Sequence, residues 1–286
     1  MKYLHLYLLF VILSFQACNM VNPKESIPTY IKIDSVHLTS TAPLIHGSVS
    51  QKITDVWVYY NRQLLGAFQL PAKVPVICST RGELEIVAGI WDNGLSGTRA
   101  KYPFYTVDTF SFDPSPAGII NHIPTFNYRT ADSLSTAYFI EDFEQGNSFG
   151  PLYGDTSFIK TNLPGDVFEG NWSNKLELSE TAKFGQSATI QEFTLPNDKM
   201  CYLELNYKND IPFELKAEVH QLSSVFNVKL IGMNTTDKWG KIYVNFGTVA
   251  ASYPNATFKF VLEATLPSGK TTGKVLIDNF KIIHFK

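Results

Sequence analysis

Side chains that could drive a reaction are scattered along this chain of 286 residues. The histidines form no His-x-x-x-His pair and the cysteines form no Cys-x-x-Cys pair, which are common zinc-binding spacings. No Gly-x-Ser-x-Gly turn is present to expose a serine nucleophile. The sequence therefore argues against a zinc centre and against a serine hydrolase. The histidines are His5, His37, His46, His122, His220 and His284.

Paired carboxylates are the one catalytic arrangement that the sequence leaves open. Glycoside hydrolysis needs two carboxyl groups several ångströms apart, and acidic residues are frequent in this chain. The pairs Glu83/Glu85 and Glu177/Glu180 fit the exposed faces of strands equally well. We therefore predict that the protein is not an enzyme, and we keep a glycan-active enzyme as the third alternative for its function.

Aromatic residues in polar loops are candidates for binding sugars. A ring face can stack on a sugar, while amides and carboxylates bind the hydroxyl groups. Trp172 lies between Asn171 and Ser173, and Tyr153 is flanked by Pro151 and Gly154. We predict that Trp172, Asn171 and Tyr153 contact a ligand. Packing is the expected role of the other tryptophans, which lie in or beside apolar strands: Trp57, Trp91 and Trp239.

Composition places the chain among folded proteins without a basic surface. It is 44% hydrophobic and 14% aromatic, which is enough to build cores. The formal net charge is −2, so no nucleic-acid partner is indicated. Cys201 alternates in phase with Leu203 and Leu205, which favours a small core residue over a disulfide with Cys78.

Residues 27–105 have the period of strands. Ile53–Tyr60 and Leu64–Leu70 are rich in β-branched and aromatic residues, and Asn61-Arg62 between them predicts a hairpin. The order of features here is a strand, a turn, Leu65-Gly66 and then a proline. In this order the stretch resembles the small β-sandwich modules of the PEGA or carboxypeptidase-regulatory type. The resemblance implies a β-sandwich that serves as a spacer or a binding platform.

Residues 106–136 and 137–286 differ in pattern. The first stretch is rich in proline and has no long periodic segment, so we expect a linker between two domains. The second contains short alternating segments such as Phe213–Val219, where apolar and charged residues alternate as in a sheet with one wet face. We predict an all-β fold, in which a small β-sandwich is followed by a larger jelly-roll β-sandwich.

Three motifs of the second domain resemble the galactose-binding-like jelly rolls that serve as carbohydrate-binding modules. They are Glu141-Asp142-Phe143-Glu144, Lys238-Trp239 ahead of an apolar strand, and Val275–Phe280. The resemblance implies that the first and last strands are neighbours and that their edge holds a structural calcium. Asp142, Glu144 and Asp278 would then supply ligands, completed by backbone carbonyls and water. The alternative is that these acids are exposed residues at strand ends.

The start of the chain indicates its location. Lys2 precedes an apolar run, Tyr3–Phe15, that is shorter than the roughly 20 residues of a membrane-spanning helix. Ala17-Cys18 resembles the lipobox of bacterial lipoproteins, and the chain as a whole, with its two β domains, resembles cell-envelope lipoproteins of the Bacteroidetes type. The resemblance implies a signal peptide over residues 1–17, an acylated Cys18 that anchors the chain to the membrane, and a tether over residues 18–26.

We therefore expect a lipid-anchored protein of the outer membrane, facing either the periplasm or the exterior. Its expected function is the non-catalytic binding of a glycan. The alternative is a structural or assembly subunit that docks on an envelope protein partner. A structural calcium is the only cofactor that the sequence suggests.

Overall fold

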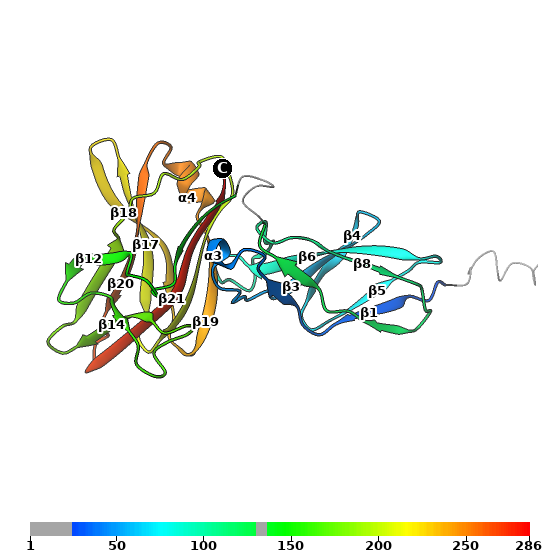
Figure 1. The fold of residues 1–286 in the computed structure, drawn as a ribbon, viewed down its shortest axis with the longest axis horizontal. Helices are drawn as coiled ribbons and strands as arrows, with labels where there is room; N and C mark the ends of the chain where they lie inside the picture. The colour runs from blue at the N-terminus through cyan, green and yellow to red at the C-terminus, as the bar shows by residue number, and fades with distance from the viewer. Residues whose placement is uncertain (1–24, 130–135) are drawn as a thin grey trace, which may run out of the picture.

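The computed structural model describes residues 25–129 and 136–286, and its fold is all-β as predicted. The predicted signal peptide, the lipid site at Cys18 and most of the tether lie outside the described residues. Within the described parts of the chain, no helix has the length and apolar character needed to cross a membrane. Figure 1 shows two bodies of strands arranged along the long axis, the first coloured blue to green and the second green to red.

The first domain is a small β-sandwich. Its elements are β1 (Thr29–Ile33), β2 (His37–Thr39), α3 (Pro43–His46), β3 (Asp55–Tyr60), β4 (Gln63–Gln69), β5 (Ala72–Val76), β6 (Gly82–Trp91), β7 (Arg99–Lys101), β8 (Asp108–Phe112), β9 (Ile119–Asn121) and β10 (Thr125–Asn127). One sheet has the order β5-β1-β9, and the other has the order β4-β3-β6-β7 with β8 also paired to β6. The strands β2 and β10 form a separate pair.

The hairpin predicted at Asn61-Arg62 is formed by β3 and β4. Asn61 and Arg62 have positive φ values of 48° and 66°, the conformation that matches a two-residue turn to the twist of its strands. Strand alternation buries Val56 and Val58 completely. The sandwich is thus present, and its likeness to PEGA modules stays a prediction.

Residues 106–136 do not act only as a linker. Within this stretch β8 pairs with β6, β9 pairs in parallel with β1, and β10 pairs in parallel with β2. Phe126 and Tyr128 are buried in the first-domain core. The structure therefore assigns residues 106–129 of the expected linker to the first domain, because their short strands complete sheets that begin earlier in the chain, while Thr136 already belongs to β11.

The second domain is a larger sandwich of two sheets. Its elements are β11 (Thr136–Glu141), β12 (Phe149–Gly154), β13 (Ile159–Thr161), β14 (Ser173–Ser179), β15 (Phe184–Thr189), β16 (Cys201–Asn209), β17 (Phe213–Gln221), β18 (Ser224–Met233), β19 (Thr236–Asn245), α4 (Gly247–Ser252), β20 (Thr257–Thr265) and β21 (Thr272–Phe285). The six-stranded sheet has the order β13-β14-β21-β16-β19, with β11 also paired to β21. The five-stranded sheet has the order β12-β15-β20-β17-β18. The first and last strands, β11 and β21, are neighbours as the jelly-roll resemblance implied.

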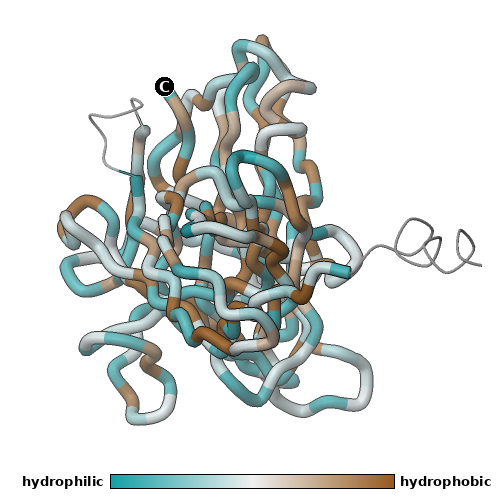
Figure 2. Tube along the Cα trace, turned by 90° about the vertical axis from the view of Figure 1, so that its right-hand side faces the viewer, coloured by the Kyte–Doolittle hydropathy of each residue, from teal (hydrophilic) through white to brown (hydrophobic). Residues whose placement is uncertain are grey.

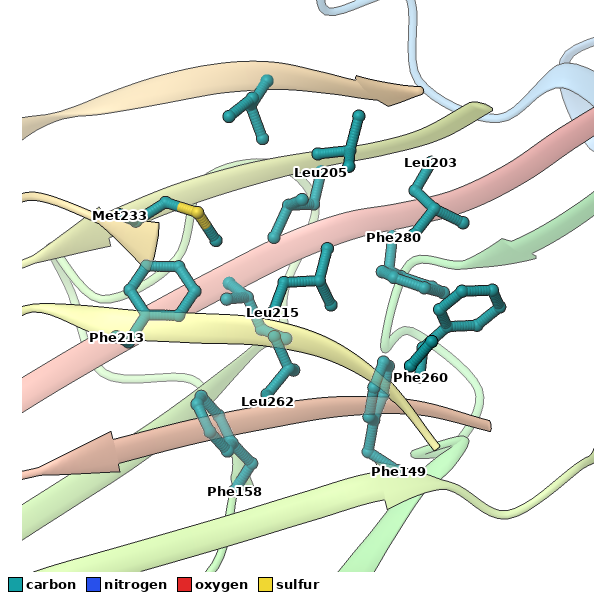
Figure 3. Close-up of a cluster of buried hydrophobic side chains, with 14 of the residues drawn as sticks. Phe149, Phe158, Leu203, Leu205, Phe213, Leu215, Met233, Phe260, Leu262 and Phe280 are labelled. Carbon is teal, nitrogen blue, oxygen red and sulfur yellow. The ribbon is translucent and has the colours of Figure 1, made fainter. Parts of the chain in front are cut away.

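The core of the second domain lies between its two sheets (Figure 3). Phe213 and Leu215 of β17 cluster there with Leu203 and Leu205 of β16. Hydrophobic and hydrophilic stretches alternate along the chain trace in Figure 2. Along β17 buried and half-buried residues alternate, because successive side chains of a strand point to opposite faces. Cys201 is a free thiol buried in this core, which confirms the core interpretation over the disulfide.

The two domains pack directly against each other, with α3 at the junction in Figure 1. Tyr202, Tyr243 and Ile283 of the six-stranded sheet belong to the hydrophobic cluster of the first domain. The Lys52 N–H donates to the Tyr243 hydroxyl at 3.1 Å, and the Asn245 N–H donates to Asn93 Oδ1 at 2.9 Å. The first domain thus covers part of the outer face of the six-stranded sheet.

Candidate functional site

Two of the predicted site residues, Asp142 and Glu144, line a cleft between the two domains, which we call the interdomain cleft. Its volume is about 410 Å³. One wall comes from the segment around α3, and the other comes from the loops that follow β11 and precede β14. The cleft is lined by Ser40, Pro43, Gly47, Ser48, Val49, Asp142, Glu144, Glu169, Gly170 and Asn279.

Glu169 joins the two walls of the interdomain cleft. The Ser48 hydroxyl of the first domain donates to Glu169 Oε2 at 2.5 Å, and Asn279 Nδ2 donates to the same oxygen at 3.2 Å. Sequence reasoning missed all three residues. They come from distant parts of the chain, and no local pattern distinguishes them from ordinary polar loop residues.

Glu144 organises the loop that carries Asn171 and Trp172. Its Oε1 accepts the N–H groups of Asn171 at 2.8 Å and Trp172 at 2.9 Å, and its Oε2 accepts from Asn171 Nδ2 at 3.2 Å. Gly170 permits this approach, since its φ is 68° and a Cβ there would lie 2.4 Å from Glu144 Oε1. Burial alone would raise the pKa of Glu144, but these donors and the charge of Lys160 hold it below the usual value.

The three acids predicted to bind calcium are only partly brought together. Asp142 and Glu144 line the interdomain cleft, and Asp142 Oδ1 accepts the Glu144 N–H at 3.1 Å. Asp278 is 1% exposed, with Oδ2 accepting from the Ser173 hydroxyl at 2.6 Å and Oδ1 from the Asn279 N–H at 2.7 Å. Burial outweighs these bonds and raises its pKa to about 7.

The oxygen donors at this edge suit calcium in chemistry but form an incomplete set. No group of three or more His, Cys, Asp and Glu side chains is close enough to hold a metal ion within the described residues. An ion at Asp142 and Glu144 would need backbone carbonyls and water to reach six to eight ligands. Calcium at Asp142, Glu144 and Asp278 therefore stays a prediction.

Trp172 is half-buried, which limits its use as a sugar platform. Its side chain packs against the core of the second domain. Lys160 Nζ lies 4.7 Å from its ring centroid, in a cation–π contact. A sugar stacking on that side of the ring would have to displace the ammonium group. Asn171 is exposed beside it, but its side chain is already bonded to Glu144.

Tyr153 lies apart from the other predicted residues, on the edge strand β12. Its side chain is 76% exposed. It pairs in register with Gln186, which pairs with Glu263, which in turn pairs with Glu214. Paired residues share a face of a sheet, and the core residues of β17 and β20 occupy the opposite face. We call this set, together with Lys216, the outer row: Tyr153, Gln186, Glu263, Lys216 and Glu214.

Hydrogen bonds hold the outer row in a fixed arrangement. Gln186 Nε2 donates to Glu263 Oε2 at 2.6 Å, and Lys216 Nζ donates to Glu263 Oε1 at 2.6 Å. Lys216 Nζ also lies 3.3 Å from Glu214 Oε2. Burial would lower the pKa of Lys216, but Glu263 and Glu214 raise it. The hydrogen bond from Lys229 lowers the pKa of Glu214. Beside the row is a hollow of about 360 Å³, lined in part by Glu214, Lys229 and Glu263.

The carboxylate pairs considered for catalysis lie on strand faces or turns. Glu83 is exposed on β6, and Glu85 is half-buried on the same face because the buried residues alternate with them. Glu177 is exposed and forms an ion pair with Lys175 at 3.0 Å. Glu180 is exposed beyond the end of β14. These positions agree with the alternative interpretation, in which both pairs are ordinary acidic residues of strand faces and turns.

No protein-family model and no curated protein matches this chain. Among solved structures, the K1 cleaved adhesin domain of Lys-gingipain from Porphyromonas gingivalis is 15% identical, covers 51% of this chain and 97% of its own, and has a TM-score of 0.38. A family 22 carbohydrate-binding module of Clostridium thermocellum is 11% identical, with 51% and 92% covered and a TM-score of 0.36. TmCBM61 in complex with β-1,4-galactotriose is 14% identical, with 49% and 92% covered and a TM-score of 0.34. At these scores the likeness assigns neither a family nor a ligand.

Proposed function

We propose that the protein binds a glycan without catalysis, through the outer row of the second domain. One observation carries this proposal. A tyrosine that is 76% exposed ends a row of hydrogen-bonded amide, carboxylate and ammonium groups on the open face of a sheet. An exposed ring that can stack, next to fixed polar groups that can bind hydroxyls, is the chemistry of sugar recognition.

The arrangement lets a sugar bind with little reorganisation. The Tyr153 ring offers an apolar face at the edge strand, while Glu263 and Glu214 accept hydrogen bonds from hydroxyls. Lys216 and Lys229 donate to hydroxyl oxygens. Because these groups already fix one another, little side-chain entropy is lost when the ligand arrives. The hollow beside Glu263 gives a sugar unit room next to the row.

The protonation states support binding over hydrolysis. A glycosidase keeps one carboxylic acid protonated near neutral pH. Glu214 in the outer row and Glu144 in the interdomain cleft both have a lowered pKa, so each is ionised. Asp278 has a raised pKa, but it is 1% exposed and lines neither surface.

The test is retention of the protein by polysaccharides in affinity gels, with ligands first chosen on a glycan array. We expect Tyr153→Ala and Glu263→Gln to lose at least tenfold in affinity, about 1.4 kcal/mol. Trp172→Ala tests the loop predicted from the sequence. The matched control is Tyr30→Ala, which removes a half-exposed tyrosine of the first domain. If both outer-row variants are retained as strongly as the wild type and Trp172→Ala loses retention, the binding site lies in the loop around Trp172. Failure of the wild type to bind any glycan would end the proposal.

The proposal includes a lipid anchor on Cys18 that holds the domains at the outer membrane. Its support is the sequence Lys2 to Cys18 alone. Attachment through acyl chains is stable when more than one chain inserts. Cys18→Ser should release a folded protein into the soluble fraction, and recovery of this variant in membranes would contradict the anchor.

Docking on an envelope protein is the second candidate function. The hairpin of β17 and β18 favours it, because Leu222, Val225 and Phe226 are exposed at 104%, 60% and 36%. Clustered exposed apolar side chains are typical of protein contact sites. Crosslinking in intact envelopes should then yield an adduct that Val225→Lys abolishes while Tyr153→Ala does not. The reverse dependence would assign the adduct to the outer row.

A further inference from the structure

The interface between the domains contains a buried charge cluster with one positive charge in excess. Glu204 is completely buried, and its Oε2 accepts from Lys241 Nζ at 2.7 Å. Lys281 Nζ lies 3.7 Å from the same oxygen and has no hydrogen-bond partner among the described residues. One carboxylate therefore faces two ammonium groups, and only Lys241 is bonded to it.

The first domain closes this cluster. The hydroxyls of Tyr102 and Tyr128 both donate to Glu204, the second at 2.8 Å. Lys281 Nζ lies 3.7 Å from the centroid of the Tyr128 ring. We call the set the Glu204 cluster: Glu204, Lys241, Lys281, Tyr102 and Tyr128. Without the first domain, Glu204, Lys241 and Lys281 would lie on the outer face of the six-stranded sheet, in contact with water.

The other titratable groups around Lys281 do not balance its charge. His46 of α3 is buried, with its ring centroid 5.6 Å from that of Tyr128 and its Nε2 without a partner in the described residues. Tyr138 of β11 lies 5.1 Å from His46, and the Tyr243 hydroxyl of β19 is bonded to that of Tyr105. Glu169 is the other carboxylate that acts on Lys281, and it is bonded to Ser48 and Asn279.

We propose that the Glu204 cluster is a proton-sensitive latch, which holds the first domain on the second more tightly when Lys281 loses its proton. A buried ammonium group without hydrogen bonds is costly, so the docked form binds this proton weakly. Once the domains separate, water solvates Lys281 and the proton binds strongly. Proton binding therefore favours separation.

The pH window follows from the two states of Lys281. Burial, opposed by Glu204 and supported by Lys241, lowers its pKa to about 7 in the docked form, against 10.5 for a solvated lysine. A group with a lowered pKa stabilises the docked form fully above the higher value, and this contribution is lost as pH falls toward the lower one. Between pH 8.5 and pH 6.5, Lys281 alone should reduce the ratio of docked to separated molecules roughly twentyfold.

In the docked form, the other titratable groups around Lys281 do not change protonation between pH 6.5 and pH 8.5. Burial and Lys281 lower the pKa of His46 from 6.5, so His46 stays neutral in the docked form, and its protonation in the separated form changes the ratio by at most about twofold at pH 6.5. Burial raises the pKa of Tyr102 and Tyr128 well above 10, so both stay neutral within it. Burial opposes the ionised form of Glu204, but the two lysines hold its pKa at about 2.

The test measures the distance between the domains by single-molecule fluorescence transfer in the full chain. Dyes are placed at Gln63→Cys and Asn227→Cys, which are exposed positions in the two domains, with Cys18 and Cys78 replaced by serine. Urea is set to populate both forms at pH 8.5. We expect the ratio of docked to separated molecules to be roughly twentyfold lower at pH 6.5 than at pH 8.5, and a ratio that does not change with pH would overturn the latch.

The decisive variant is Lys281→Met, which keeps the apolar stem and removes the charge. Its ratio of docked to separated molecules should change by no more than about twofold between pH 8.5 and pH 6.5, whereas Lys216→Met on the open sheet should keep the roughly twentyfold response of the wild type. A pH response retained in Lys281→Met would overturn the proposal. If that variant does not fold, the lysine Cε resonances of the wild type decide. One lysine titrating near pH 7 supports the latch, and all lysines titrating above pH 9.5 contradict it.

Discussion

The outer faces of the two sheets in the second domain carry the same kinds of residue in two different environments. On the six-stranded sheet Glu204, Lys241 and Lys281 are covered by tyrosines of the first domain. On the five-stranded sheet no domain covers Glu263 and Lys216, which are each 18% exposed, and Tyr153 at the edge of the sheet is 76% exposed. The residue types are the same at the interface and on the open surface. What distinguishes the two faces is that the first domain covers one of them.

Covering by the first domain changes how much each ion pair contributes to the stability of the fold. In water an ion pair is screened and contributes about 0–1 kcal/mol. In a buried site the same pair must offset the loss of hydration, and removing one partner leaves a charge with no compensation. Glu204 should therefore hold the two domains together, while Glu263 should be nearly neutral for stability and important for a ligand.

The largest expected effect comes from removing the two carboxylate charges in turn. Glu204→Gln should lower the free energy of unfolding by about 3–5 kcal/mol, because the Lys241 ammonium group remains buried without a counter-charge. Glu263→Gln should change it by about 1 kcal/mol or less. Urea unfolding near pH 8 measures both. Equal losses in the two variants would mean that the interface and the open face do not differ in this way.

Acid should narrow the gap between the wild type and Glu204→Gln. The pKa of Glu204 is about 2 in the folded protein against 4.5 for a free side chain. Because the folded value is the lower one, its stabilisation is full above about pH 4.5 and is lost as pH falls toward 2. The difference in unfolding free energy should thus be constant from pH 6 to pH 5 and shrink by pH 3. A gap that stays constant down to pH 3 would place the pKa of Glu204 elsewhere.

A smaller difference in the free energy of unfolding is expected when one tyrosine hydroxyl is removed from the interface and one from the open face. Tyr128→Phe removes a donor to the buried Glu204 carboxylate, which should cost about 1–3 kcal/mol. Tyr153→Phe removes a hydroxyl from an exposed ring and should cost less than about 0.5 kcal/mol. Chemical denaturation of both variants gives the comparison. A costly Tyr153→Phe would show that Tyr153 has a structural role that its exposure does not reveal.

The strands could be predicted from the sequence because their signal is local. Alternation along Phe213–Val219 and the turn at Asn61-Arg62 need no knowledge of distant residues, and both are present. The short strands β9 and β10 were missed because they pair with β1 and β2, which lie about 90 residues earlier. Such pairing has no local period.

The surfaces were harder to predict for the same reason. Leu203-Glu204-Leu205 follows the alternation of a strand with one wet face, and nothing nearby in sequence indicates that Tyr102 and Tyr128 will cover Glu204. Tyr153 was predicted as a ligand contact, but its partners Gln186 and Glu263 follow only from strand register. The polar loop around Trp172 was visible, although its bonds to Glu144 were not.

The smallest expected effect concerns calcium at the edge between β11 and β21. At this edge one predicted calcium ligand is exposed and another is buried. Asp142 is exposed in the interdomain cleft, while Asp278 is buried in hydrogen bonds to Ser173 and Asn279. If calcium binds as the resemblance implies, an excess of about tenfold over the dissociation constant adds about 1.4 kcal/mol, or roughly 2–4 °C in melting temperature. Asp142→Asn should remove this rise, because it removes the charge that is most accessible to the ion. A melting temperature that does not respond to calcium in the wild type would end the prediction, and an equal rise with magnesium would make the site one for any divalent cation.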